Sequence, residues 1–411
     1  MFSSRTNWPL APNRLSEAVA ERRQRGLEIL DLTESNPTRA GFEFAPEELL
    51  DALGDPRFLR YEPDPRGLRI AREAVAAYYG ERGVAVDPEQ VFLTTSTSEA
   101  YSYVFRLLAD PGDRVLAPRP SYPLFDFLAR LDDVDLTPYP LVYDHEWRID
   151  FNELRNGLRD SSSGAAVTAA SGRARAILVV HPNNPTGSFA GRDEAARLVD
   201  LCRSHDTALI ADEVFADYAL VPPEQATLGE RGRRAGSFAS TTEALAFTLS
   251  GLSKISALPQ MKLAWIVVSG PDALRHSALE RLEVIADTYL SVSAPLAYAL
   301  PQWLEMRHGV QPQIMARLRS NLRYLDEQIA AGSSLSRLEV EGGWYAILRV
   351  PATRSDEDWA LELVQSDGVL VHPGHFYDFP SDGFLVVSLL TAPEIFEPGL
   401  RSLMARVSGH G

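Results

Sequence analysis

The sequence predicts an α/β protein, with a large domain built on a mostly parallel sheet between helices and a smaller α+β domain. Three observations predict this class. Short apolar runs alternate with longer amphipathic stretches over residues 91–268, the last hundred residues change to long helical stretches and short strand-like runs, and 411 residues are too many for one small core. Domains average about 150 residues, and continuously apolar strands are typical of parallel sheets covered on both faces.

The expected elements of the large domain follow one another at regular intervals. Runs of branched and aromatic residues predict strands at 91–93, 114–117, 176–180, 208–211, 246–249 and 264–268. Helical stretches at 100–108 and 192–205 separate some of these strands. A strand, a helix and a second strand in this order favour parallel pairing.

The last third of the chain reads differently. Long helical stretches are expected at 271–304 and 311–329, and short strands at 338–340, 344–348, 369–371 and 385–387. We therefore expect a large domain over residues 46–295 and a small domain that combines residues 1–45 with 296–411. The Ser, Ala and Gly-rich stretch 160–173 is expected to be a surface loop.

Composition narrows the function classes. A formal net charge of −16 disfavours nucleic acid and anionic membranes as partners. The single cysteine, Cys202, cannot form an internal disulfide, and no metal-ligand cluster surrounds it. The sequence has no apolar stretch of spanning length and no signal-peptide pattern at its start. We expect a cytoplasmic protein without a metal.

Polar residues follow three of the expected strands. Lys254 ends the run Ser-Gly-Leu-Ser-Lys, Asp212 follows the strand at 208–211, and Asn184 lies in an Asn-Pro-Thr-Gly run after the strand at 176–180. Each alone has an ordinary explanation as a surface lysine, a strand end or a turn. Because ligands bind beyond the carboxyl ends of parallel strands, these residues together predict one site.

In this order and spacing, the Asn-Pro-Thr-Gly, Asp-Glu-Val and Ser-Lys blocks resemble the fold-type I aminotransferases that use pyridoxal phosphate, the aspartate aminotransferase superfamily of class I/II. The resemblance covers nearly the whole chain. It implies the PLP-transferase fold and pyridoxal 5'-phosphate as cofactor. It also implies ping-pong transamination between an amino acid and a keto acid, in a homodimer.

The resemblance assigns roles to individual residues. Lys254 is expected to hold the cofactor as a Schiff base and to move the proton at the substrate carbon. Asp212 is expected to pair with the pyridine nitrogen, and Asn184 with the phenolic oxygen and the substrate. A lysine suits both tasks because its pKa shifts readily on burial.

Further cofactor residues follow from matching positions. The block 94–100 matches the phosphate loop, since backbone N–H groups at a helix start bind phosphate. Tyr122 matches the aromatic residue that stacks on the cofactor ring, and Tyr61 matches a tyrosine that reaches the phosphate of the neighbouring subunit. The remaining expected cofactor residues are Ser96, Thr97, Ser98, Phe215, Ser253 and Lys262.

Two positions depart from the family pattern. Phe215 stands where relatives carry a tyrosine that hydrogen-bonds the phenolic oxygen. Val386 stands where they carry the arginine that clamps the substrate carboxylate with two hydrogen bonds. The candidates that we weigh as its replacement are Arg39, Arg349 and His375, and the expected substrate residues are Ser35, Asn36, Arg39, Asn184 and His375.

Two alternatives to a transaminase remain. The runner-up is a C–S lyase, a decarboxylase or a cyclising enzyme on the same scaffold, and the loss of the arginine at Val386 is the feature that keeps this alternative open. A non-catalytic ligand sensor of this fold is the other, and the acidic chain and the combination of Lys254, Asp212 and Asn184 argue against it.

Overall fold

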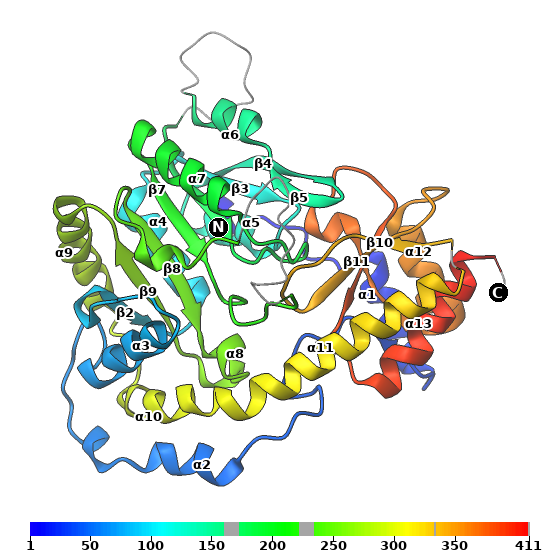
Figure 1. Ribbon diagram of the computed structural model, residues 1–411, viewed down its shortest axis with the longest axis horizontal. Coiled ribbons are helices and arrows are strands. Elements are labelled where there is room, and N and C mark those ends of the chain that lie inside the picture. The colour runs from blue at the N-terminus through cyan, green and yellow to red at the C-terminus, as the bar shows by residue number, and fades with distance from the viewer. Residues whose placement is uncertain (160–171, 222–233, 333, 410–411) are drawn as a thin grey trace.

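A single large sheet organises most of the protein. The computed structural model describes residues 1–159, 172–221, 234–332 and 334–409. Eight strands form the large sheet (Figure 1): β2 (Val91–Thr94), β3 (Arg114–Arg119), β4 (Asp135–Asp144), β5 (Glu146–Ile149), β6 (Ala174–Val180), β7 (Ala208–Asp212), β8 (Ala246–Gly251) and β9 (Ala264–Ser269).

The strands lie in the order β2-β9-β8-β7-β6-β3-β4-β5. The five central strands from β8 to β4 pair in parallel, whereas β9 is antiparallel to both of its neighbours and β5 to β4. The predicted mostly parallel sheet is confirmed. Its parallel strands bring their carboxyl ends to one edge, where ligands bind in open sheets.

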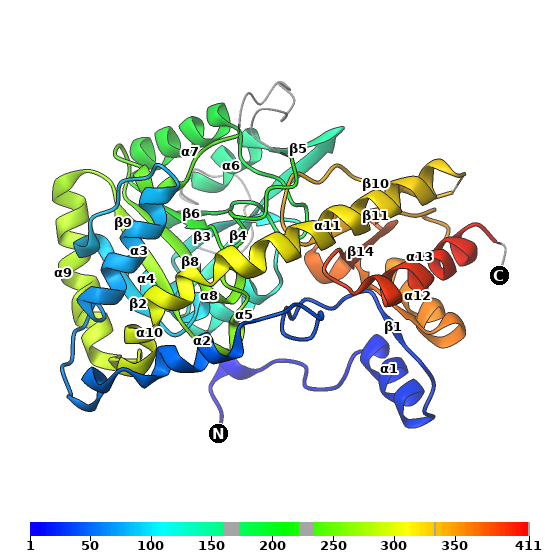
Figure 2. The ribbon, with the colours of Figure 1, turned by 60° about the horizontal axis from the view of Figure 1, so that its bottom comes forward.

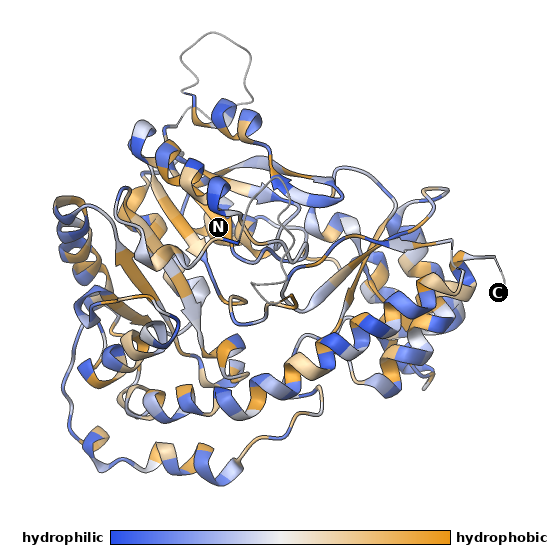
Figure 3. Ribbon diagram, viewed as in Figure 1, coloured by the Kyte–Doolittle hydropathy of each residue, from blue (hydrophilic) through white to orange (hydrophobic). Residues whose placement is uncertain are grey.

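Helices cover both faces of this sheet. Strand β8 shows why the strands are continuously apolar: Ala246 faces one cluster of buried residues, Phe247 faces another, and both are fully buried. Helices α4 (Thr97–Leu108), α5 (Leu124–Leu131) and α9 (Asp272–Tyr289) pack on the Phe247 face. The opposite face is covered by α3 (Arg69–Glu81), α6 (Phe151–Leu158), α7 (Arg192–His205) and α10 (Ala294–Glu305). Figure 3 shows the resulting apolar layer along the strands.

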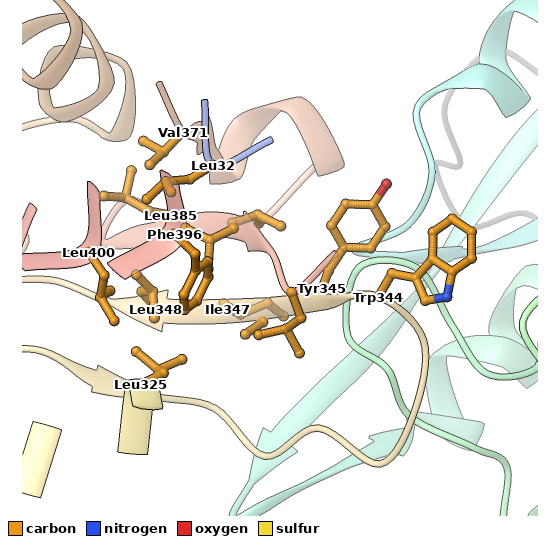
Figure 4. Packing of buried hydrophobic residues seen from close by; sticks show 14 of the residues in the cluster. Leu32, Leu325, Trp344, Tyr345, Ile347, Leu348, Val371, Leu385, Phe396 and Leu400 are labelled. Carbon is orange, nitrogen blue, oxygen red and sulfur yellow. The ribbon is translucent and has the colours of Figure 1, made fainter. Parts of the chain in front are cut away.

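Two small sheets, with helices beside them, form a second part of the fold. One has the order β10-β11-β14-β13, and the other pairs β1 with β12 in parallel. Their strands are β1 (Leu30–Asp31), β10 (Ser336–Arg337), β11 (Tyr345–Arg349), β12 (Val369–Leu370), β13 (His372–Pro373) and β14 (Phe384–Ser388). Helices α1 (Arg14–Gln24), α12 (Asp356–Glu362) and α13 (Pro393–Val407) accompany them, and Figure 4 shows Phe396 and Leu400 packed near Leu348.

The long helix α11 (Arg307–Ala330) connects the two parts. It follows α10 beside the large sheet and ends against α13, as Figure 2 shows. Two short helices complete the set, α2 (Pro46–Asp51) and α8 (Leu252–Ile255). Within the described residues, no helix combines the length and apolar composition needed to cross a bilayer.

Some expected elements differ from the structure. The helix expected at 271–304 is two helices, because Leu290 adopts a left-handed conformation and Pro295 lies in the first turn of α10. The strand expected at 338–340 is displaced, since the strand residues are Ser336 and Arg337. The hairpin of β4 and β5, with His145 at a positive φ of 61°, was not expected.

The domain division stays a prediction. Trp303 and Leu304 of α10 lie in the same buried cluster as Trp265 of the large sheet. We therefore propose a division of the expected kind with its second boundary after Glu305 rather than at residue 295. Residues 160–171 of the expected surface loop lie outside the described residues.

Candidate active site

A cavity of about 340 Å³ lies beyond the carboxyl ends of the parallel strands. It brings together most of the residues that the sequence singles out: Ser35, Ser96, Thr97, Ser98, Tyr122, Asn184, Asp212, Phe215, Ser253, Lys254 and Lys262. They come from segments spread over more than half of the chain. The sheet therefore assembles them as the strand-end argument predicts.

Lys254 lies in α8, directly after β8. The side chain is partly accessible because it faces the cavity, but protein encloses its amino group, and this burial lowers the pKa of the amine to about 8, with Asp212 acting in the opposite direction. Its Nζ lies 4.7 Å from the ring centroid of Trp344 and 5.4 Å from that of Phe215. With this pKa roughly a tenth of the amine is deprotonated at pH 7, far more than for an ordinary lysine.

Asp212 is the last residue of β7 and is buried. Its Oδ2 accepts a hydrogen bond of 2.8 Å from the Tyr101 hydroxyl, and its Oδ1 accepts one of 3.1 Å from the Val214 backbone N–H. Burial raises the pKa of this carboxyl, while both hydrogen bonds and Lys254 lower it. Two donors thus fix the plane of the carboxylate at the edge of the cavity.

The turn that carries Asn184 is held by its neighbours. The Asn183 side chain donates to the Pro120 carbonyl and to Thr186, and Gly187 has a φ of 68° with no room for a Cβ against the Gly342 carbonyl. Asn184 itself is buried, and its Oδ1 has no hydrogen-bond partner within the described part of the chain. A buried amide oxygen without a partner at a cavity wall is typical of a ligand-binding position.

The start of α4 forms another wall. Ser96 is the N-cap, and its hydroxyl accepts a hydrogen bond of 3.1 Å from the Glu99 backbone N–H. The Glu99 carboxylate in turn accepts one of 2.7 Å from the Thr95 backbone N–H. The N–H groups of Thr97 and Ser98 in the first turn have no partner among the described residues, and Lys262 lines the same cavity. This wall suits an anion.

The opposite wall of the cavity comes from the part of the fold built on the two small sheets. Tyr345 at the start of β11 lines the cavity together with Ser35 (Figure 4 shows Tyr345 and Trp344 apart from the Phe396 cluster). Burial raises the pKa of Tyr345 to about 12, and a hydrogen bond with the Ser35 side chain opposes that rise. Val386 pairs with Ile347, so the register places it on the same sheet face as Tyr345.

The structure does not bring the remaining predicted residues into this cavity. Arg39 and His375 are exposed, and so is Arg349, which lies over the rings of Tyr143 and Phe384. Asn36 instead accepts hydrogen bonds from the backbone and hydroxyl of Thr38. None of these four residues lines the cavity.

Tyr61 lies at a different place. It is 81% exposed and lines a second cavity of about 340 Å³ formed by residues 58–68 and the segment after α9. Within one chain it therefore does not meet Lys254. The prediction for this residue concerns the phosphate bound by a neighbouring subunit.

Sequence reasoning missed Tyr101, Trp344 and Tyr345. Tyr345 and Trp344 were placed in an expected strand without a role, and the alternation of strand side chains was the signal that one of them faces the site. Tyr101 occupies an apolar helix face, where a tyrosine is ordinary core. Its contact with Asp212 depends on how α4 packs against β7, which no local pattern shows.

Comparison with known proteins places this geometry in a family. The family described as aminotransferase class I and II matches residues 28–395. The glutamate-pyruvate aminotransferase AlaA of Escherichia coli strain K12 is 25% identical over 395 residues, which is 94% of this chain and 92% of that protein. The LL-diaminopimelate aminotransferase of Dehalococcoides mccartyi is 25% identical over 401 residues, 95% of this chain and 94% of that protein.

Solved structures show the same fold. The alanine aminotransferase from Pyrococcus furiosus superposes with a TM-score of 0.85 at 21% identity, covering 100% of both chains. Because the family match spans most of the sequence, the protein belongs to the class I and class II aminotransferases.

Proposed function

We propose that this aminotransferase uses pyridoxal phosphate attached to Lys254 and transfers an amino group between an amino acid and a keto acid by a ping-pong route. The observation that carries the proposal is the enclosed Lys254 amine, with its pKa lowered to about 8, in the same cavity as Asp212 and Asn184. A lysine in this state is prepared to react with a carbonyl.

The residues present fit the cofactor. The N–H groups of Thr97 and Ser98 and the cation of Lys262 suit its phosphate. The side-chain NH2 of Asn184, which lines the same cavity, can donate a hydrogen bond to its phenolic oxygen. The second lone pair on each Asp212 oxygen is available to a protonated ring nitrogen. We call this part of the cavity the cofactor end, formed by Ser96, Thr97, Ser98, Asn184, Asp212, Lys254 and Lys262.

The chain's own groups then divide the work. When bound, pyridoxal phosphate supplies an electron sink for charge at the substrate carbon that bears the amino group. The Lys254 amine takes the proton from that carbon and delivers it to the cofactor carbon. Asp212 would keep the ring nitrogen protonated, and Tyr122, which lines the same cavity, would lie against the ring.

The part of the cavity formed by Ser35 and Tyr345, which we call the substrate end, lacks the family's cation. Among the described residues that line the cavity there is no arginine, and Val386 stands where the family resemblance leads us to expect one. We propose that the hydroxyls of Ser35 and Tyr345, together with Asn184, hold the substrate carboxylate. Neutral donors bind a carboxylate more weakly than a bidentate arginine, so a high KM for amino acids follows.

The active form is proposed to be a homodimer. Leu59 and Tyr61 are 80% and 81% exposed beside the second cavity, and a second copy would cover them. Tyr61 of one copy would then reach the phosphate of the other. Light scattering of the purified protein tests the dimer, and subcellular fractionation tests the cytoplasmic location that the sequence predicts.

An absorbance experiment tests the function. Purified protein with pyridoxal phosphate is expected to show a visible band that disappears on addition of an amino donor and returns on addition of a keto acid. Lys254→Ala is expected to remove the covalent link and to lower kcat by about 10⁴-fold or more. A band that forms equally in Lys254→Ala contradicts the proposal. Release of pyruvate or carbon dioxide without conversion of the band favours the lyase or decarboxylase alternative.

A further inference from the structure

The carboxylate of Asp212 is held by a contact from outside its own strand. The Val214 N–H that bonds Oδ1 is local, two residues along the chain, whereas the Tyr101 hydroxyl that bonds Oδ2 comes from α4. A carboxylate accepts at about four positions, so each oxygen keeps a lone pair for a ligand. The two contacts together fix the direction in which those lone pairs point.

Tyr101 is itself fixed. It is 2% exposed, and its ring packs against Phe125 and Phe105 at centroid distances of 5.2 Å and 5.9 Å. Burial and the nearby Asp212 raise the pKa of this phenol well above its usual value. The hydroxyl therefore keeps its proton and acts only as a donor toward Asp212.

The position of Tyr101 on α4 links the two halves of the cofactor end. Thr97 opens the helix at the anion-binding wall, and Tyr101 lies four residues later on the same helix face. The helix that presents its first N–H groups to the cavity thus also presents the donor to Asp212. A displacement of α4 would move both contacts at once.

We propose that Tyr101 is a positioning residue of the reaction, which aims the Asp212 carboxylate at the cofactor's ring nitrogen and keeps it ionised in a buried site. This inference rests on the proposed function. Burial alone favours the protonated acid, and a protonated acid cannot accept a hydrogen bond from a protonated ring nitrogen at the same oxygen. The hydroxyl of Tyr101 opposes that protonation.

The other groups that bear on Asp212 are few and identifiable in the described chain. Lys254 acts on it from α8, Tyr122 lies near it after β3, and Glu213 is its neighbour in sequence. Glu213 turns away, because its carboxylate accepts from the Ser237 hydroxyl and the Phe238 N–H. Variants at Tyr101 leave all three unchanged, so a shift in pH dependence reports the lost hydroxyl.

The test measures the dissociation constant of pyridoxamine phosphate, which has an amine in place of the aldehyde and cannot bond covalently to Lys254. Tyr101→Phe is expected to raise this constant about tenfold at neutral pH, the effect of one lost hydrogen bond to a charged group. It is also expected to move the acidic limit of binding to higher pH, because the Asp212 carboxyl is easier to protonate. The free ligand titrates identically in every sample, so differences between variants come from the protein.

Tyr139→Phe is the matched control. Tyr139 is 1% exposed, and its hydroxyl donates a 2.7 Å hydrogen bond to the Leu178 carbonyl, far along the sheet from Asp212. It is expected to lose a similar amount of stability without changing the binding curve. Coinciding pH curves for Tyr101→Phe and Tyr139→Phe would overturn the inference.

A double-mutant cycle separates positioning from general damage. In an Asp212→Ala background, Tyr101→Phe is expected to cause no further loss of binding, because the carboxylate that accepts from its hydroxyl is gone. An additional tenfold loss there means that Tyr101 acts by another route and overturns the inference. If the wild-type protein does not bind pyridoxamine phosphate, both the proposed function and this inference are wrong. If the wild-type protein binds it and the Tyr101 variant binds it equally well, only this inference is wrong.

Discussion

The two ends of the cavity are built in opposite ways. The cofactor end comes from residues that follow successive strands of one sheet, and it carries charges on Lys254, Lys262 and Asp212. The substrate end comes from Ser35 and Tyr345, which belong to the small sheets, and it is neutral. Cofactor chemistry is thus fixed by short local motifs, whereas the choice of substrate depends on how distant segments meet.

The largest expected effect comes from a substitution at the charged cofactor end. Asp212→Ala is expected to lower kcat by about 10²–10³-fold, the range for removing one preorganised electrostatic group, and to weaken cofactor binding. Asp113→Ala is the control. Asp113 is a buried carboxylate that accepts a hydrogen bond from Arg175, and it lies just before β3, at the amino ends of the parallel strands. Steady-state kinetics showing equal losses of kcat in both variants would contradict the assignment.

A second test uses the state of the Lys254 amine. Burial lowers its pKa to about 8, so the rate at which added pyridoxal phosphate attaches to the apoprotein is expected to rise about tenfold per pH unit and to level off above about pH 8. Stopped-flow absorbance measures this rate. A rate that keeps rising with pH up to about 10.5, the ordinary pKa of a lysine, means that the pKa of this amine is not lowered.

The same shift has a consequence for stability. Between about pH 8 and 10.5 the unfolded chain binds the Lys254 proton and the folded chain does not. The apoprotein is therefore expected to gain stability as the pH rises through this window, relative to Lys254→Ala. Denaturant titrations of the two proteins across the window measure the difference.

At the neutral end the expected effect is smaller. Tyr345→Phe is expected to raise KM for amino acids by about three- to tenfold with little change in kcat, because it removes one neutral donor to the carboxylate. Tyr324→Phe, which loses a hydrogen bond from Arg401 on the far side of the small sheets, serves as control. A fall in kcat with KM unchanged would place Tyr345 outside carboxylate binding.

The smallest expected effect is the loss of stability on removal of a helix N-cap, and it is compared at two helices. Ser96→Ala and Ser355→Ala each remove an N-cap hydroxyl that accepts a 3.1 Å hydrogen bond, at α4 and α12 respectively. Each is expected to cost about 1 kcal/mol of stability. Only Ser96→Ala is expected to weaken the binding of inorganic phosphate as a competitor of the cofactor. Thermal melts and competition titrations distinguish the two results.

The same contrast explains what the sequence could predict. The central strands, the parallel sheet and the meeting of Asn184, Asp212 and Lys254 follow from apolar runs and from polar residues at strand ends, which are local patterns. Tyr101 reaches Asp212 only through helix packing, which joins residues far apart in sequence, so periodicity carries no sign of this contact. For Trp344 and Tyr345, strand alternation indicates that one of the two faces the cavity, but only the tertiary packing decides that it is Tyr345.

The expected replacements for the missing arginine show the same limit. Arg39 and His375 were plausible because their segments lie near the site in the family pattern. In the structure Arg39 and His375 are exposed and do not line the cavity. The break between α9 and α10 was readable in principle from Ser293 and Pro295, because a cap residue followed by proline starts a helix.

The pairing of β1 with β12 joins Leu30 and Asp31 to Val369 and Leu370. On the ribosome, β1 emerges when most of the chain is still unsynthesised, and domains complete themselves from the amino end. The segment that carries Ser35 therefore waits for nearly the last strand before it has a neighbour to pair with. The wall of Ser35 and Tyr345 can therefore be completed only after the segments that carry Asp212 and Lys254 have been synthesised.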